Sequence, residues 1–243
     1  MSTRCYVPME TEYPASLTID GPAAHHLARV LRMSTGDALE LFNGTGRIAT
    51  AAIAQITKHS VTVAIRAQRQ EQRPVPRITL VQALIRPQPM DWVVRKATEL
   101  GMQHLQPVLT EHCVVRTRER PERWQKTLIS AAEQCGANWL PTVAPVQKLT
   151  DWLQAPERPD TVYLCSLTDD TQPFKTALRA QPTPPAHVAV VVGPEGDFSP
   201  PEREAARAVG AIPVSLGTLT LRAETAALMA MAALRYEFDG AGD

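Results

Sequence analysis

The chain has 243 residues, which suffices for one large domain or two modest ones, and its hydrophobic content of 44% is that of an ordinary globular protein. It carries 25 Lys and Arg and 25 Asp and Glu, so its formal net charge of zero excludes a chain that is basic throughout. No apolar stretch reaches the length of a membrane span and the N-terminus has no signal-peptide core, so we expect a cytoplasmic protein with no membrane partner.

The charges are unevenly distributed along the chain. Residues 1–150 hold 18 Lys and Arg against 12 Asp and Glu, whereas residues 151–243 hold 7 against 13. Nucleic acid is bound by local positive surface and not by the charge of a whole chain. Any surface that binds nucleic acid is therefore expected in the first two-thirds of the sequence.

The first 72 residues predict a small β-rich module. A short helix and three strands are expected, at residues 23–33, 38–42, 47–56 and 60–67. The polar stretch 66–77 contains two prolines and indicates an interdomain linker. We therefore expect one domain at residues 1–72 and a second at residues 73–243.

From residue 78 onward, strand-like apolar runs alternate with helical patterns. The expected strands are residues 78–85, 105–109, 162–166, 187–192 and 212–216. The expected helices are residues 90–100, 121–135, 151–154, 174–180, 200–209 and 222–237. Such alternation is typical of an α/β domain with a mostly parallel sheet.

The four cysteines, Cys5, Cys113, Cys135 and Cys165, are widely separated and form no Cys-x-x-Cys pair. The spacing predicts neither a disulfide framework nor a zinc ribbon. His112 precedes Cys113, but two ligands do not make a metal site, so we expect no metal.

Two segments near the C-terminus place glycines and polar groups where an apolar strand ends and a helix begins. They are Val190–Glu202, with the sequence VVVGPEGDFSPPE, and Leu216–Ala226, with the sequence LGTLTLRAETA. In open α/β folds, ligands bind at this edge of the sheet. Two such corners only 20-odd residues apart predict one pocket built from both.

The first of these segments has the pattern of a strand, a loop and a capped helix. The β-branched run His187–Val192 indicates a strand buried on both faces. Ser199, Pro200 and Glu202 form a capping box with proline at the first helical position. The loop between them matches neither a Walker A sequence nor a dinucleotide-binding glycine motif. On spacing alone, an ordinary strand–turn–helix corner remains an equal alternative.

Several motifs in order carry a family resemblance over nearly the whole chain. They are the two C-terminal segments, His25–Arg32 with Gly36-Asp37, Lys96–Gly101, Arg123–Lys126 and Ala131–Gln134. Together they resemble the SPOUT class of S-adenosylmethionine-dependent RNA methyltransferases. More closely, they resemble the 16S ribosomal RNA uridine-N3 methyltransferases, the small-subunit methyltransferase E family. Asp197 stands where a second glycine is usual, and Leu219 where an arginine is common.

The resemblance implies a SPOUT-type α/β fold whose parallel sheet carries a C-terminal trefoil knot, preceded by a small PUA-like RNA-binding β-barrel. It implies methyl transfer from S-adenosylmethionine to N3 of a uridine in the 16S rRNA of the small ribosomal subunit. The two C-terminal segments and the loop after Ser166 would form the knot and hold the cofactor. The implied cofactor residues are Leu164, Gly193, Gly196, Leu216, Gly217, Leu221 and Thr225.

Arg222 and Glu195 are the candidate catalytic residues. Arg222 sits at a loop–helix junction, where a guanidinium could hold a phosphate or a uracil carbonyl. The alternative is a surface charge pair with Glu224. Glu195 could orient Arg222 or approach the sulfonium of the cofactor, and it could equally cap a backbone amide.

The densest basic run is the candidate RNA-binding surface. It comprises Arg116, Arg118, Arg120, Arg123 and Lys126. Arg29, Arg32 and Arg47 could extend it to further phosphates. The alternative is a solvated charged face.

The last helix, 222–237, is apolar all round, which indicates burial within one subunit or packing against a second. The resemblance favours a homodimer through this helix. Two rival functions remain open from the sequence. One is methylation of another RNA position, such as a ribose 2′-hydroxyl or a guanine. The other is a non-catalytic RNA-binding or ribosome-assembly factor.

Overall fold

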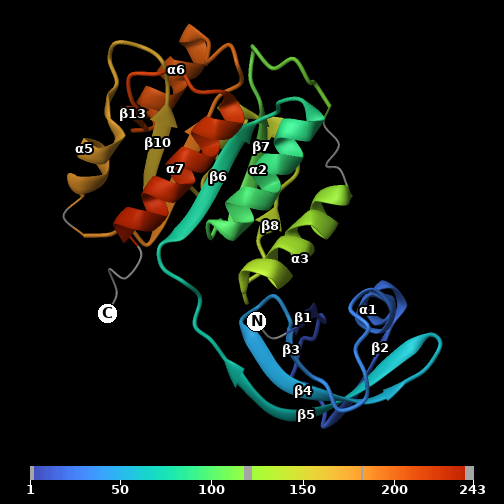
Figure 1. Ribbon diagram of the computed structural model, residues 1–243. Helices are drawn as coiled ribbons and strands as arrows, with labels where there is room; N and C mark the ends of the chain where they lie inside the picture. The colour runs from blue at the N-terminus through green and yellow to red at the C-terminus, as the bar shows by residue number, and fades with distance from the viewer. Residues whose placement is uncertain (1–2, 118–121, 182, 239–243) are drawn as a thin grey trace. The chain divides into compact units, whose positions relative to one another are not determined.

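The computed structural model describes residues 3–117, 122–181 and 183–238 (Figure 1). The chain divides into two compact units. The first consists of Met1–Arg73 and Ala132–Leu140, and the second of Pro74–Ala131 and Pro141–Asp243. Each unit has its own sheet.

The first unit is built on a five-stranded sheet in the order β1-β3-β4-β5-β2. Its strands are β1 (Thr3–Tyr6), β2 (Ser16–Asp20), β3 (Ala38–Phe42), β4 (Arg47–Ile56) and β5 (Ser60–Gln70). The pair β1–β3 is parallel and the other pairs are antiparallel. Two register shifts in the β4–β5 pair accompany the marked curvature of these strands in Figure 1.

The three strands predicted in this unit are confirmed, and two differences stand out. The short strands β1 and β2 were not expected, because edge strands of four or five residues carry little alternation. The strand β5 also runs three residues past its predicted end, because Gln70 pairs with Arg47 of β4. Residues 66–70 are therefore sheet and not linker.

The predicted helix 23–33 is two consecutive short turns of different type. An α-helical turn, α1 (Gly21–His25), continues directly into a π-helical turn, η1 (His26–Val30). The Leu31 N–H donates to the carbonyl of His26, five residues back, at 2.9 Å. Arg32 then adopts a left-handed backbone angle, φ 54°, which ends the helical run.

The end of a helix from far along the chain completes the first unit. This helix is α3 (Arg123–Cys135), and its last residues and the loop after it lie against β1. Arg4 donates to the Gly136 carbonyl at 2.8 Å and pairs with Glu40 at 3.1 Å. The Glu133 carboxylate accepts from the Tyr6 N–H at 3.0 Å. The contacts of Arg4 with Gly136 and of Tyr6 with Glu133 span more than 120 residues, so no local pattern predicts them.

The second unit is built on an eight-stranded sheet in which every pair is parallel. The order is β11-β13-β10-β12-β6-β7-β8, with β9 also paired to β7. The longer strands are β6 (Arg77–Ala83), β7 (His104–Leu109), β10 (Thr161–Cys165), β12 (His187–Val192) and β13 (Ile212–Ser215). The two-residue strands are β8 (Thr142–Val143), β9 (Gln147–Lys148) and β11 (Gln172–Pro173). The predicted α/β architecture with a parallel sheet is confirmed.

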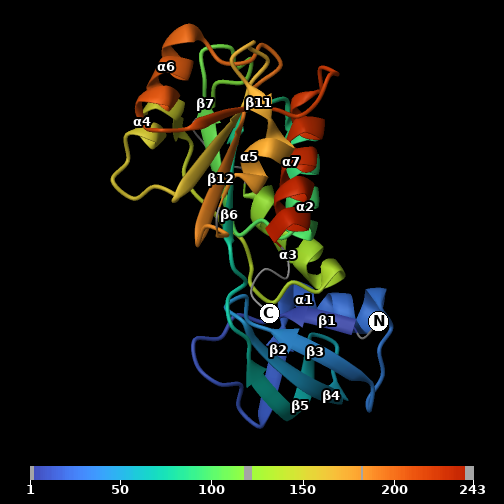
Figure 2. The ribbon, with the colours of Figure 1, turned by 90° about the vertical axis from the view of Figure 1, so that its left-hand side faces the viewer.

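Helices cover both faces of this sheet (Figure 2). On one face, α7 (Ala223–Phe238) packs against α2 (Pro87–Glu99) and α5 (Phe174–Arg179). On the other, α4 (Leu149–Leu153) packs against α6 (Pro200–Ala208). Covered on both sides, β12 needs apolar residues at every position, and Val188 to Val192 are all buried.

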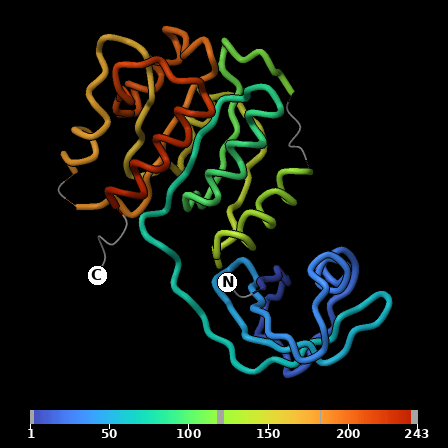
Figure 3. The backbone as a smooth tube through the Cα atoms, viewed as in Figure 1, coloured from blue at the N-terminus to red at the C-terminus, as the bar shows by residue number. Residues whose placement is uncertain are grey.

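Because the strands run in one direction, the loops that follow them gather at one end of the sheet (Figure 3). The loops after β10, β12 and β13 are the three in which the resemblance places the trefoil knot. The knot itself stays a prediction.

No helix in the described part of the chain is long and apolar enough to cross a membrane.

The central sheet strands should dominate the stability of the second unit. Leu80 of β6 is fully buried, so Leu80→Ala is expected to lower the free energy of unfolding by roughly 2–5 kcal/mol. Leu219→Ala removes the same atoms from a side chain that is 77% exposed. It should change the free energy of unfolding by less than about 0.5 kcal/mol. Urea denaturation of both variants checks this, and equal losses would contradict the assigned core.

Candidate functional site

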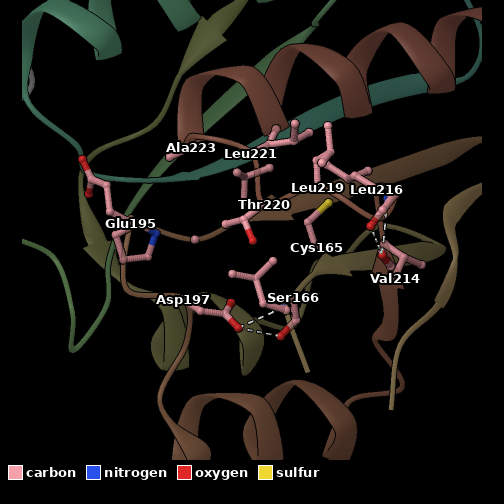
Figure 4. Close-up of a pocket in the computed structure, with 17 residues that line it drawn as sticks. Cys165, Ser166, Glu195, Asp197, Val214, Leu216, Leu219, Thr220, Leu221 and Ala223 are labelled. Carbon is pink, nitrogen blue, oxygen red and sulfur yellow. Dashed lines mark hydrogen bonds between the residues drawn. The ribbon is translucent and has the colours of Figure 1, made fainter. Parts of the chain in front are cut away.

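One pocket lies at the carboxyl end of the parallel sheet, where three loops meet (Figure 4). The loop after β10 contributes Ser166 and Leu167, the loop after β12 contributes residues 193–195 and 197, and the loop after β13 contributes residues 216, 217 and 219–221. Cys165, Val192 and Val214, at or near the strand ends, line it as well, together with Ala223 and Ala226 of α7. The two C-terminal sequence segments thus form one pocket, as predicted.

The lining combines apolar walls with negative charge. Val192, Val214, Leu216 and Leu221 supply hydrocarbon surface. The charged side chains are Glu195 and Asp197, and none of the lining residues, all in the described ranges, is basic. Such a lining suits a ligand with an apolar part and a positive charge, and it is unfavourable for a phosphate.

Asp197 joins two of the three loops. Its carboxylate accepts a hydrogen bond from the Ser166 hydroxyl at 2.9 Å and another from the Leu167 N–H at 3.0 Å. Its own backbone is left-handed, with φ 56°. A residue with a Cβ is uncommon in this conformation, although aspartate tolerates it better than most.

The same loop is held from its other side by His112, which follows β7. The ring Nδ1–H donates to the carbonyls of Gly196 at 2.7 Å and Asp197 at 3.0 Å. These carbonyls favour the protonated ring and raise the pKa of His112. A Cβ at Gly196 would lie 3.0 Å from the His112 Cβ, so close packing of the histidine explains the glycine.

The predicted capping box sets the start of α6. The Glu202 carboxylate accepts from the Ser199 N–H at 2.9 Å, and its second oxygen accepts from the Glu111 N–H at 2.8 Å. Glu202 is 7% exposed, so both bonds are shielded from water. The helix is thereby tied to the loop after β7, which also carries His112.

Four of the seven residues expected to hold the cofactor line the pocket, namely Gly193, Leu216, Gly217 and Leu221. Leu164 does not, because neighbouring residues of a strand point to opposite faces, and Cys165 lines the pocket in its place. Thr225 does not, because Ala223 and Ala226 occupy the helix face turned to the pocket and Thr225 is exposed. Gly196 contacts His112 instead. Cofactor contacts at all seven stay predictions.

The two expected catalytic residues are placed differently. Glu195 lines the pocket, but its side chain is exposed and points away from the cluster formed by Ser166 and Asp197 in Figure 4. Arg222 is exposed and lies between the lining residues Leu221 and Ala223. Its carbonyl accepts from the Ala226 N–H at 2.8 Å, so it sits at the first turn of α7. The roles of both stay predictions.

Of the basic residues expected to bind RNA, Arg29 and Arg32 are exposed in the first unit. Arg47 in that unit pairs with Glu12 at 3.4 Å. In the second unit, Arg116 is exposed and donates to the Glu111 carbonyl at 2.8 Å, while Arg123 pairs with Asp91 at 2.9 Å. Arg118 and Arg120 lie outside the described residues.

The resemblance implied that the loop after Ser166 helps to hold the cofactor, but sequence reasoning did not name Cys165, Ser166 or Leu167, which line the pocket at the end of β10. No glycine motif marks this strand end. The signal that could have found it is the sheet order, in which β10 lies between β12 and β13. Within the described ranges, no group of His, Cys, Asp and Glu side chains could hold a metal ion.

Comparison with known proteins decides the family. Residues 71–235 match the RNA methyltransferase domain family, and residues 19–66 match the RNA methyltransferase PUA domain family. The ribosomal RNA small subunit methyltransferase E of Synechocystis is 33% identical, over 96% of this chain and 77% of that protein. The chain belongs to the small subunit methyltransferase E family. The resemblance inferred from the sequence motifs is therefore confirmed.

Two solved structures of similar proteins contain the cofactor. A putative methyltransferase from Legionella pneumophila, in complex with S-adenosylmethionine, is 32% identical with a TM-score of 0.83. The methyltransferase E of Neisseria gonorrhoeae, bound to S-adenosylmethionine, is 31% identical with a TM-score of 0.84. Each comparison covers 97% of this chain and 98% of the other. They support S-adenosylmethionine as the cofactor and an N-terminal PUA-like domain.

The pocket of this methyltransferase E chain fits that cofactor. S-adenosylmethionine carries a positive sulfonium and an apolar adenine face, and the lining offers carboxylates and hydrocarbon walls. Gly217, with φ 136°, keeps the loop after β13 in a conformation that residues with a Cβ rarely adopt. Gly193, Leu216, Gly217 and Leu221 are the residues that would hold the cofactor.

Cys165 lines this pocket as a neutral thiol. Removal from water raises its pKa to about 12, and the charge of Asp197 adds to the effect. A thiolate beside a methyl donor would itself be a nucleophile. The raised pKa protects the cysteine from that reaction.

The thiol of Cys165 should therefore resist alkylation. Raising its pKa from 9.0 to about 12 lowers the thiolate fraction at about pH 8 by about a thousandfold. Iodoacetamide should label Cys165 far more slowly in folded protein than in denaturant, as measured by mass spectrometry of its peptide. Equal rates in the two states would contradict the shift.

Proposed function

We propose that this protein transfers the methyl group of S-adenosylmethionine to N3 of a uridine in the 16S rRNA of the small ribosomal subunit. The observation that carries the proposal is the acidic, apolar-walled pocket at the carboxyl end of the sheet, in a chain of the methyltransferase E family. The N3 position itself comes from the sequence resemblance. Such an enzyme would act in the cytoplasm, where ribosomal subunits are assembled.

The chemistry of N3 sets two demands on the protein. This nitrogen lies on the pairing edge of uracil, so the base must be unpaired or extruded from its stack before it can react. It also carries a proton at neutral pH. Removal of that proton leaves a negative charge spread over the two carbonyl oxygens of the ring.

Arg222 is the residue proposed to meet the second demand. Its position between Leu221 and Ala223 puts a guanidinium next to the residues that line the pocket. A donor aimed at a uracil oxygen would stabilise the deprotonated ring and, with it, the transition state. The cofactor supplies an activated methyl group. The protein then needs to hold the base in line with that group, which is a matter of proximity and orientation.

The substrate surface is proposed to be basic residues outside the acidic pocket. Arg116 of the second unit and Arg29 and Arg32 of the first are exposed and available for phosphates. Arg47 and Arg123 are already paired with carboxylates, so we expect smaller contributions from them. Arg118 is also proposed to bind RNA, because it belongs to the densest basic run of the sequence.

A homodimer through α7 is part of the proposal. One face of α7 is buried in its own unit, by Ala227, Ala230, Met231 and Leu234. The opposite face leaves Met229 46% and Tyr236 83% exposed. Light scattering coupled to size exclusion tests this association, and a monomer at micromolar concentration would contradict it.

The function is tested with purified protein, labelled S-adenosylmethionine and small ribosomal subunits from cells that lack the modification. Nucleoside analysis of the rRNA should find the label in 3-methyluridine. Label in a ribose 2′-O-methyl nucleoside or a methylguanosine would move the proposal to that position. Absence of both label and cofactor binding by calorimetry would favour an RNA-binding or assembly factor.

Arg222 provides the first mutational prediction. Arg222→Ala should leave folding and cofactor affinity close to wild type, because the side chain is exposed, and should lower the methylation rate by about a hundredfold or more. Arg222→Lys, which keeps the charge but loses the planar fork, should fall between the two. Single-turnover methylation and calorimetry provide the measurements. Wild-type turnover by Arg222→Ala would remove its assigned role.

Arg116 provides the second mutational prediction. Charge reversal in Arg116→Glu should weaken RNA binding several-fold and make its salt dependence shallower, because a phosphate contact is lost. Lys175→Glu makes the same change in charge at an exposed position of α5 that is not part of the proposed RNA-binding surface. Filter binding across a salt series compares the two. If both variants had the same RNA affinity and the same salt dependence, Arg116 would be excluded from the RNA-binding surface.

A further inference from the structure

The loop after β12 is held in an unfavourable backbone conformation at one residue. Asp197 has φ 56°, in the region where a Cβ crowds the backbone and where glycine is the usual residue. Its N–H donates to the Pro194 carbonyl at 3.1 Å, which closes the turn from 194 to 197. Such a conformation persists only where surrounding contacts enforce it.

The enforcing contacts reach two other loops. The Asp197 carboxylate accepts from the Ser166 hydroxyl and the Leu167 N–H, which belong to the loop after β10. The Asp197 carbonyl accepts from His112 after β7. Figure 4 shows the carboxylate turned toward Ser166 across the pocket lining. One side-chain oxygen thus fixes the separation of two loops that line the pocket.

Hydrogen bonds to an ionised carboxylate are stronger than those between neutral groups. Ser166 is 6% exposed, which shields its bond from water. A glycine at 197 would relax the backbone but would leave the Ser166 hydroxyl and the Leu167 N–H without this acceptor. The two loops would then lose both of these hydrogen bonds.

We propose that Asp197 is a positioning residue that preorganises the cofactor pocket by latching the loop after β10 to the loop after β12. We call the hydrogen bonds from Ser166 and Leu167 to Asp197 the loop latch. It lowers the cost of ordering the loops when the cofactor binds, and so increases affinity through the order of the loops, in addition to the charge that the carboxylate brings to the lining. This inference rests on the proposed function, since it takes S-adenosylmethionine as the ligand.

The latch and a direct electrostatic attraction predict different effects on the binding of two related compounds. S-adenosylhomocysteine has the shape of the cofactor without the methyl group and its positive sulfur. A carboxylate that attracts the sulfonium would matter for S-adenosylmethionine alone. A latch that orders the loops matters equally for both compounds.

Three variants isolate the latch. Asp197→Gly permits the same backbone angle without the carboxylate. Asp197→Asn keeps tolerance of the left-handed conformation and one carbonyl oxygen that can accept both bonds. Ser166→Ala removes one of the two donors. Asp169→Gly is the matched control, because Asp169 is exposed in the loop after β10 and belongs to no part of the latch.

Calorimetry with both compounds is the first readout. Asp197→Gly should weaken the binding of both compounds by about tenfold. The affinities of Asp197→Asn should stay within about threefold of wild type, and those of Asp169→Gly should match wild type. Ser166→Ala should lose part of the affinity, and should add nothing to Asp197→Gly, because the two changes break one interaction.

Hydrogen exchange without any ligand is the second readout. The Leu167 amide should exchange faster in Asp197→Gly than in wild type or Asp197→Asn. The amides of β12 serve as an internal control, and their unchanged protection verifies that Asp197→Gly is folded.

Two results would overturn the latch while leaving the proposed function intact. One is wild-type affinity for both compounds in Asp197→Gly. The other is a loss confined to S-adenosylmethionine and shared by Asp197→Asn, which would assign direct attraction to the charge. Failure of the wild-type protein to bind either compound would instead overturn the proposed function itself.

Discussion

The parallel direction of every strand pair in the second unit is the constraint on which the site depends. It brings the ends of β10, β12 and β13 to the same edge, although their loops are separated by tens of residues in sequence. The β-branched run of β12 allows this, because a strand between two others with helices on both faces must be apolar throughout. The pocket follows from the sheet and not from any one motif.

Neighbouring residues around the start of α6 connect the pocket loops to one another. Asp197 contacts the loop after β10, and His112 reaches back from the loop after β7. Glu202 accepts from the backbone N–H of Ser199, just before α6, and from that of Glu111 in the loop after β7. Three polar side chains from separate elements therefore hold the glycine-containing loop, so its glycines need not make it flexible. A preformed site is the physical consequence.

The pocket and the proposed RNA-binding residues carry opposite charge. The lining has two carboxylates and suits a positive cofactor, whereas the exposed Arg29, Arg32 and Arg116 suit phosphates. An acidic lining is unfavourable for the phosphates of RNA, so under the proposed function an extruded base would be the part best suited to enter.

The sequence by itself determined the family, the alternating α/β order, the capped start of α6 and five predicted site residues that line the pocket, Glu195 among them. These follow from local patterns, which depend on residues a few positions apart. Tertiary structure alone decided that Cys165 and not Leu164 faces the pocket, that Gly196 packs on His112, and that Asp197 joins Ser166. It also decided that residues 132–140 complete the first unit through Arg4 and Glu133. Each of these depends on partners 30 or more positions away, and sequence spacing carries no information about such contacts.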